Sequence, residues 1–331
     1  MSRTAPSGNA GQLSLARLAP ERALRRLELT IVRRLEGFLH GEHLGLLPGP
    51  GTDLAEARAY RPGEDDVRRM DWSVTARTAT PHVRDVIADR ELETWVLVDM
   101  SASMDFGTAA LEKRELAVAA VGTVGFLTHR LGDRFGGVVV RGGRIRRWPA
   151  RSGRLALYGL LRSLLAEPRT EPEEPDDDFA TAVDQFSRAY QRRGLRVVVS
   201  DFLDGSGNDP GLPLPWERAM KLLSARHQVL AVEVLDPLEL ELPDVGVVWL
   251  TDPETGGVRE VNTGDAALRV RYAEAAAAHR ERVRATLRRS GAAHLTLRTD
   301  RDWVSDTARF VLGHRRVAQR LHGPPTRGTA G

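Results

Sequence analysis

One carboxylate and two hydroxyls follow a short apolar run at residues 95–98, and they occupy alternate positions: Asp99, Ser101 and Ser103. If the run is a strand, side chains spaced in this way where it ends can point in one direction and gather hard oxygen atoms. Magnesium prefers such ligands in octahedral geometry, and it keeps several waters and few carboxylates. The spacing therefore predicts a divalent-metal site, with magnesium favoured and another divalent cation left open.

A second apolar run, at residues 195–199, ends in the same way at Ser200 and Asp201. From a neighbouring strand end, Asp201 could hold one of the metal-bound waters. Each of these residues alone is also typical of a helix N-cap or a local side-chain turn. Their recurrence at two strand ends favours the metal site.

The elements that must position these residues alternate along the chain. Short, apolar strands separated by helices indicate a mostly parallel sheet covered on both faces, which is a doubly wound, Rossmann-like α/β fold. Such sheets bind ligands at the carboxyl ends of their strands, near a topological switch point. The predicted strands are 95–98, 135–140, 144–148, 195–200, 227–235 and 294–297, and the predicted helices are 113–131, 155–165, 179–192, 216–225, 265–289 and 303–312.

The flanking segments divide the chain further. Apolar residues recur at steps of three and four from Leu24 to Phe38, which predicts an amphipathic N-terminal helix. We expect a small β-rich, charged appendage after it, with a strand at 82–88, and a β insertion between the last strands. The predicted segments are a disordered tail at 1–17, the helix and appendage at 18–92, the α/β domain at 93–313 with its insertion at 236–262, and a basic helix end and disordered tail at 314–331.

Composition excludes several classes of protein. The chain has no cysteine, so disulfides, thiolate metal sites and cysteine nucleophiles are absent. No apolar run approaches the roughly 20 residues of a membrane span, and the N-terminus has no secretory h-region, so we expect a cytoplasmic protein. The net charge is only +3. Arginines cluster at 280–289 and near 314–320, but acidic residues interleave elsewhere and no aromatic stacking pattern accompanies them. We therefore favour a solvated helix face, and nucleic-acid binding is the least favoured function.

Longer segments carry a family resemblance. Residues 98–104 resemble the metal-ion-dependent adhesion site of von Willebrand factor A domains, and Ser200-Asp201 resembles its later acidic loop. Residues 61–72 with 75–77, and 236–256, resemble the hallmarks of the bacterial domain-of-unknown-function family fifty-eight. The resemblance runs from about residue 37 to residue 312. It implies a von Willebrand factor A-like fold and an adaptor or assembly factor that works with a MoxR-type AAA+ ATPase. Many members are anchored in a membrane near the N-terminus, and no such segment is evident here.

The chain departs from the adhesion-site pattern at one position. A third hydroxyl, from a threonine, usually comes from the loop that enters a later helix. Here the comparison places Asp177 at that position, whereas Thr181 lies one turn further along. A second carboxylate would make the site more anionic and a partner's acid less welcome. The expected ligand set is therefore Asp99, Ser101, Ser103, Asp201 and either Asp177 or Thr181.

Two other hallmark segments each have two interpretations. The dense charges of residues 61–72 could form an ion-pair network that fixes the N-terminal part to the α/β domain, with Trp72 in the core, or they could face a partner or the metal cleft. We favour the structural interpretation because Arg–carboxylate pairs commonly fix geometry. The turn-rich residues 236–256 suggest an inserted β excursion, or equally a recognition edge.

We expect a non-enzymatic protein-binding module with a metal-bound site. The enzyme alternative is a metal-dependent hydrolase or phosphatase at the same strand end. Dehalogenase-like phosphatases need an acid/base two residues after the nucleophilic aspartate, and that position is Ser101. The chain also lacks a Gly-Lys-Ser/Thr phosphate loop and a Gly-x-Ser-x-Gly elbow; residues 141–144 are instead typical of a hairpin turn.

Overall fold

The computed structural model describes helical positions between Leu24 and Arg34, and then residues 57–60, 70, 72–78, 80–84, 93–109, 111–128, 134–169, 179–190, 192–203, 212–251 and 257–322. The chain divides into two compact units. The larger unit contains Met1–Leu46 and Leu92–Gly313, and the smaller one contains Leu47–Glu91 and His314–Gly331. The described part of the predicted N-terminal helix therefore belongs to the same unit as the sheet.

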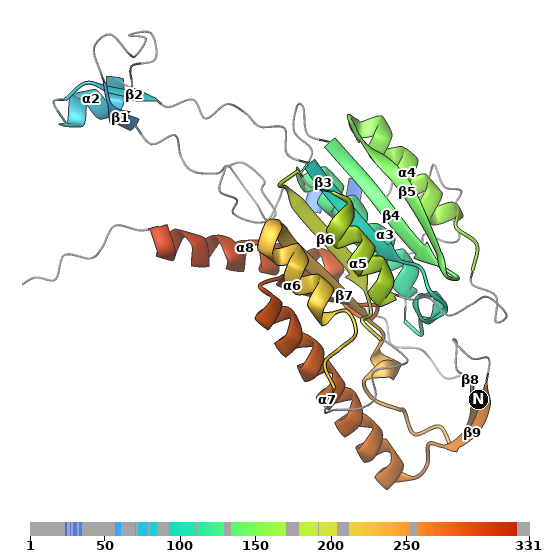
Figure 1. The fold of residues 1–331 in the computed structure, drawn as a ribbon. Helices are drawn as coiled ribbons and strands as arrows, with labels where there is room; N and C mark the ends of the chain where they lie inside the picture. Colours follow the sequence, from blue (N-terminus) through green and yellow to red (C-terminus); the bar gives the residue numbers. More distant parts are fainter. Residues whose placement is uncertain are drawn as a thin grey trace, which may run out of the picture. The chain divides into compact units, whose positions relative to one another are not determined.

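A six-stranded sheet forms the centre of the larger unit, in the order β10-β7-β6-β3-β4-β5 (Figure 1). All neighbouring strands are parallel except β4 and β5, which are antiparallel. This confirms the mostly parallel α/β sheet predicted from the apolar runs. The strands are β3 (Glu93–Asp99), β4 (Arg134–Arg141), β5 (Arg144–Ser152), β6 (Leu195–Ser200), β7 (Gln228–Leu235) and β10 (Ala293–Arg298).

The connection between β4 and β5 is a two-residue turn. Gly142 and Gly143 both have positive φ angles, of 53° and 67°. This conformation matches the twist of a tight hairpin, and glycine adopts it without a Cβ clash. The hairpin expected at residues 141–144 is therefore present.

Helices cover both faces of the sheet (Figure 1). On one face, apolar side chains from the sheet form a continuous core with residues of α5, α6 and α7. On the other face, α4 packs so closely that a Cβ on Gly137 would lie 2.8 Å from Leu160, and α3 packs against α4. The helices are α3 (Lys113–Thr128), α4 (Arg154–Ala166), α5 (Phe179–Ala189), α6 (Glu217–Arg226), α7 (Ala266–Ser290) and α8 (Trp303–His322).

The N-terminal helical residues pack on α3. Leu27 and Ile31 are buried, and a Cβ on Gly122 would lie 2.9 Å from Leu27 Cδ2. At the other end of the chain, α8 continues to His322, ten residues beyond the end predicted at residue 312. Among the described residues, no helix combines the length and the apolar character that crossing a bilayer requires.

Between β7 and α7 the chain forms a short 3-10 helix, η4 (Pro237–Glu239), and then an antiparallel hairpin of β8 (Val247–Thr251) and β9 (Val258–Asn262). This segment coincides with the β insertion predicted at 236–262. Its first residues, Asp236 to Glu239, contact Thr108 and Lys113 beside the ends of the central strands.

The smaller unit contains the antiparallel pair β1 (Ala57–Ala59) and β2 (His82–Arg84), and the helix α2 (Trp72–Thr78). Trp72 is 68% exposed, so its prediction as a core residue is wrong. A two-stranded sheet and a helix of two turns have little apolar surface with which to bury an indole. Most of residues 61–71, including the predicted ion-pair network, lie outside the described residues.

Candidate metal centre

The expected ligands meet where the sheet changes direction. From β3 the chain builds outward through β4 and β5, and it then returns to add β6, β7 and β10 on the other side of β3. The carboxyl ends of β3 and β6 therefore flank a topological switch point, the usual ligand-binding position in such sheets. Asp99 ends β3, and Asp201 directly follows β6.

Asp99 is held rigidly inside the protein. It is 2% exposed, and its two carboxylate oxygens accept the Ser101 backbone N–H at 2.9 Å and the Ser200 hydroxyl at 2.6 Å. Burial, together with the nearby negative charge of Asp201, raises the pKa of Asp99 to about 7. An apolar, anionic surrounding of this kind favours a proton or a cation at the carboxylate.

The two serine hydroxyls that follow Asp99 are hydrogen-bonded to each other. A 3-10 turn, η3 (Ala102–Asp105), begins directly after Ser101 and brings the Ser101 and Ser103 oxygens to 3.1 Å from each other. Ser103 is buried and donates its hydroxyl to Asp201 Oδ2 at 2.7 Å. Ser101 is only partly buried. The cluster is therefore open toward solvent at Ser101 and closed at Asp201.

Asp201 is oriented by a strained backbone. The next residue, Phe202, has a φ of 56°, and among the described residues it is the one non-glycine with positive φ. A bulky residue rarely adopts this conformation, which persists only where its surroundings enforce it. Here the Phe202 ring is fully buried and packs against Trp216 and Phe179. The Leu203 N–H then donates to Asp201 Oδ1 at 3.0 Å.

A lysine not expected from the motif completes the interior of the site. Lys113, the first residue of α3, is fully buried; its ammonium donates to Asp201 Oδ2 at 2.8 Å and pairs with Glu239. Although burial opposes ionisation, this ammonium lowers the pKa of Asp201 below its usual value. The two carboxylates likewise raise the pKa of Lys113 against the effect of burial. Asp201 and Lys113 therefore form a charged, buried pair.

Glu239 is positioned by a capping box at η4. The Asp236 carboxylate accepts the Leu238 N–H at 3.0 Å, and the Asp236 N–H donates to Glu239 at 3.0 Å. Asp236 also accepts hydrogen bonds from Thr108 and Thr299. These donors lower the pKa of Asp236 despite its burial, whereas burial raises the pKa of Glu239 to about 7. The start of the β8–β9 insertion is thus hydrogen-bonded to the strand-end site.

The structure brings together Asp99, Ser101, Ser103 and Asp201, four of the residues expected as ligands. Thr181 is exposed on the first turn of α5, and Asp177 lies outside the described residues. Sequence reasoning missed Lys113 and Glu239. One signal was available for the first: Lys113 is one of only two lysines in a chain with 48 lysines and arginines together.

The donor set suits a hard cation that needs few carboxylate ligands. No group of three or more His, Cys, Asp or Glu side chains converges in the part of the chain that the structure describes. Adjacent ligands of a magnesium octahedron lie about 3 Å apart, because each is about 2.1 Å from the ion. The separation of 3.1 Å between the Ser101 and Ser103 oxygens matches this spacing.

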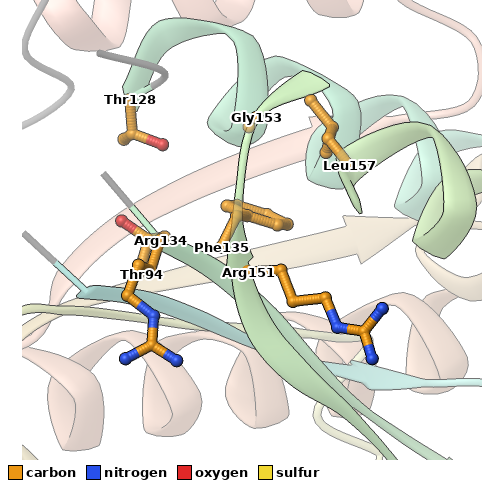
Figure 2. Close-up of a pocket in the computed structure, with 8 residues that line it drawn as sticks. Thr94, Thr128, Arg134, Phe135, Arg151, Gly153 and Leu157 are labelled. Carbon is orange, nitrogen blue, oxygen red and sulfur yellow. The ribbon is translucent and has the colours of Figure 1, made fainter. Parts of the chain in front are cut away.

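A small pocket lies at the other end of the same strands. Thr94 near the start of β3 and Arg134 at the start of β4 line it, together with Thr128 of α3 and Arg151 of β5 (Figure 2). Its cavity volume of about 10 Å³ is room for about one water. This pocket is too small to compete with the strand-end site for a ligand.

Comparison with known proteins defines the family. The family described as "Protein of unknown function DUF58" matches residues 56–282, and the chain belongs to it. This confirms the family resemblance seen in the sequence. Uncharacterized proteins of Mycobacterium bovis and Mycobacterium tuberculosis are 52% identical over 317 residues, covering 96% of this chain and 96% of each relative.

Among solved structures, the chain is similar to the conserved hypothetical protein BatB from Bacteroides thetaiotaomicron. That chain is 17% identical, with a TM-score of 0.38, and the match covers 68% of this chain and 99% of BatB. A von Willebrand factor type A structure from Catenulispora acidiphila is 11% identical, with a TM-score of 0.34, and the match covers 68% of this chain and 42% of that one.

Proposed function

We propose that this protein is a non-enzymatic protein-binding module whose strand-end site holds a magnesium ion. One observation carries the proposal: two serine hydroxyls 3.1 Å apart lie beside two buried aspartates at the switch point of the sheet. Hydroxyls, few carboxylates and waters are a ligand set that magnesium accepts. Switch points of α/β sheets are where such proteins bind their ligands.

The hydrogen bonds suggest how the residues would share the ion. Ser101 and Ser103 would contribute hydroxyl oxygens. The Ser103 hydroxyl would still donate its hydrogen bond to Asp201. The two oxygens of Asp99 already accept the Ser101 N–H and the Ser200 hydroxyl. Asp99 would therefore supply negative charge and hold a metal-bound water, and the open side at Ser101 would admit an acidic side chain from a partner.

Lys113 supports binding of an acidic partner. An extra carboxylate near an ion makes a second, incoming carboxylate less favourable. Here the Lys113 ammonium pairs with Asp201 at 2.8 Å, which leaves Asp99 as the main uncompensated charge at the site. With Asp201 balanced from inside, the ion keeps the positive field that attracts a partner's carboxylate. We favour binding over hydrolysis because Ser101 stands where a phosphatase of this kind needs an acid/base.

The partner follows from the family resemblance. We propose an adaptor or assembly factor that works with a MoxR-type AAA+ ATPase, which is the role that the resemblance to family fifty-eight implies. One hallmark segment of that family takes part in this site, because Asp236 and Glu239 contact Thr108 and Lys113.

Isothermal titration with magnesium chloride tests the metal. Wild type should give saturable heat, whereas Asp99→Ala and the double variant Ser101→Ala/Ser103→Ala should give none. Asp184→Ala is the matched control, because Asp184 is a partly exposed acid on α5 that pairs with Arg188; it should bind like wild type. No heat for wild type, or equal heat for Asp99→Ala, would refute the metal site.

Co-purification from the native cell tests the partner. An AAA+ ATPase should be recovered with wild type and with Asp184→Ala, and it should be absent with Asp99→Ala that folds normally by circular dichroism. Recovery of the ATPase with all three proteins would show that the association does not use the site. Absence of any AAA+ ATPase with wild type would refute the adaptor role.

A further inference from the structure

One segment at the edge of the sheet carries arginines without any acidic residue between them. Residues 134–166 contain eight arginines and no aspartate or glutamate. The whole chain has a formal charge of only +3, so the rest of the chain is net negative. A single-sign patch of this kind attracts an oppositely charged partner and raises its rate of association.

Four of these arginines, Arg144, Arg146, Arg147 and Arg151, lie on β5, a strand at the edge of the sheet. β5 is the last strand of the six-stranded sheet and pairs with β4 alone among the described strands. In the register, Arg146 lies opposite Val139 and Arg147 opposite Val138. Because successive residues of a strand point to opposite faces, Arg146 lies on one face and Arg147 on the other. Arg146 pairs with Glu167, which follows α4, so it lies on the face that α4 covers. Arg147 lies opposite Val138, which belongs to the core formed with α5, so it lies on the other face.

Three of the four arginines on β5 form no ion pair with a described residue. Arg144, Arg147 and Arg151 are exposed and form no ion pair with any described residue. Arg146 is 62% exposed even with Glu167 at 3.0 Å, and its guanidinium lies over the Trp148 ring at 5.3 Å. The guanidinium groups are therefore available to an incoming anionic group, and Trp148 preorganises one of them.

We infer that the outer edge of β5 is a docking site for an extended, acidic segment of a partner protein, which adds to the sheet as a further strand. An open edge supplies backbone donors and acceptors to such a strand. Side chains of the added strand alternate between the two faces, so acidic residues would meet Arg144 and Arg146 on one face and Arg147 on the other. Cross-strand pairs of opposite charge are favourable.

The presence of arginine on both faces distinguishes this partner from other polyanions. A nucleic-acid duplex or an anionic membrane presents one surface, which would engage the arginines of a single face. An added strand engages both. Charged residues on an edge strand also prevent unwanted pairing between sheets. The two roles agree, because the same arginines repel neutral or basic strands and admit an acidic one.

The site is separate from the metal centre, so its test does not depend on magnesium. A fluorescein-labelled ten-residue peptide of alternating Glu and Thr is titrated, in the presence of EDTA, against the full-length chain. Fluorescence anisotropy should show binding that weakens as salt rises. Arg144→Glu/Arg147→Glu should weaken binding at least about tenfold, because two attractive pairs become repulsive. Arg271→Glu/Arg301→Glu is the matched control, because it makes the same change in net charge at exposed residues of α7 and of the loop before α8. It should stay within about twofold of wild type.

Three further probes separate strand addition from plain charge attraction. The same peptide with alternate backbone nitrogens methylated should lose binding, since methylation removes the backbone donors that pair with an edge. A 20-base-pair duplex and phosphatidylglycerol vesicles should bind more weakly than the peptide. Equal binding of the methylated peptide, tighter binding of duplex or vesicles, or equal losses in the two double variants would each refute the inference.

Discussion

The charged residues at the strand ends around Asp201 are buried and paired, whereas those on the edge strand β5 are exposed and mostly unpaired among the described residues. At the strand ends, Asp99, Asp201 and Lys113 are buried, and Glu239 is largely so. The Lys113 ammonium pairs with Asp201 and Glu239, and Asp99 is hydrogen-bonded to Ser101 and Ser200. Along β5, arginines of one sign are exposed, and most have no ion-pair partner among the described residues. Water screens the exposed charges, whereas the buried ones depend on each other.

The difference in burial determines how strongly a single substitution should change the stability of the fold. A buried charge that loses its partner retains its full desolvation cost, so each member of the strand-end cluster is individually important. An exposed charge contributes little to folding, so the arginines of β5 are replaceable one at a time for stability and act together in binding.

The largest effect is expected at the buried lysine. Lys113→Met leaves Asp201 and Glu239 without their ammonium partner and should lower the free energy of unfolding by about 3–5 kcal/mol, measured by urea denaturation at pH 7. The matched control is the chain's other lysine: Lys221 is 50% exposed and pairs with Glu217, so Lys221→Met should cost about 1 kcal/mol or less. Similar losses in the two variants would abolish the contrast.

Asp99→Asn should act in the opposite direction. Between pH 3.8, the ordinary pKa of the group, and about 7, its pKa in the folded protein, folded Asp99 holds a proton that the unfolded chain has released. The stability of metal-free wild type therefore falls as pH rises through this window. The amide removes this loss and should stabilise the metal-free protein at pH 8 by a few kcal/mol.

Urea denaturation in EDTA at pH 5 and pH 8 measures this effect. The gain from the substitution should be larger at pH 8 than at pH 5. The same variant should lose the heat of magnesium binding, which would show that the carboxylate serves the site at a cost to the fold. A destabilised variant at pH 8 would contradict the assignment of a raised pKa.

A buried histidine gives a smaller effect with its own pH window. Burial, with the charges of Arg196 and Arg226, lowers the pKa of His227 to about 4 from an ordinary 6.5. Below pH 6.5 the unfolded chain binds a proton that the folded protein does not, so stability is lost as pH falls toward 4. At pH 5 this loss amounts to about 2 kcal/mol. His227→Gln cannot bind the proton, so the stability of the variant should stay nearly constant between pH 6.5 and pH 5. Unchanged slopes in wild type and variant would refute it.

The smallest effect is expected on β5. Arg144→Ala/Arg147→Ala removes two exposed side chains without ion pairs to described residues, and it should change the free energy of unfolding by less than about 0.5 kcal/mol. Thermal unfolding at two salt concentrations checks this. A loss comparable with that of Lys113→Met would show that these arginines stabilise the fold rather than remain available to a partner.

The sheet was predictable from sequence because its strands are short, apolar runs between amphipathic helices. Leu195–Ser200 has the predicted bounds, and each other strand of the sheet differs by a few residues at its ends. Asp99 and Asp201 were predictable as neighbours because parallel strands bring their carboxyl ends to one edge. The strands and the two aspartates could be predicted because periodicity and spacing are visible in short stretches of sequence.

Other features depend on contacts between distant parts of the chain. Lys113 and Glu239 are 126 residues apart, and nothing in the loop motif indicates that they meet beside Asp201. The left-handed conformation of Phe202 follows from the packing of its ring, not from its residue type. The exposure of Trp72 depends on how little surface its own unit offers.

The two lysines also equip the chain with a chemical reporter. Amine-reactive reagents can modify Lys221, which is half exposed, at any time, whereas Lys113 is sealed within the strand-end cluster. Labelling of Lys113 therefore requires the cluster to open, and its rate relative to Lys221 measures how often opening occurs. Mass spectrometry of these two positions would follow the site during titration with magnesium or a partner, without any engineered label.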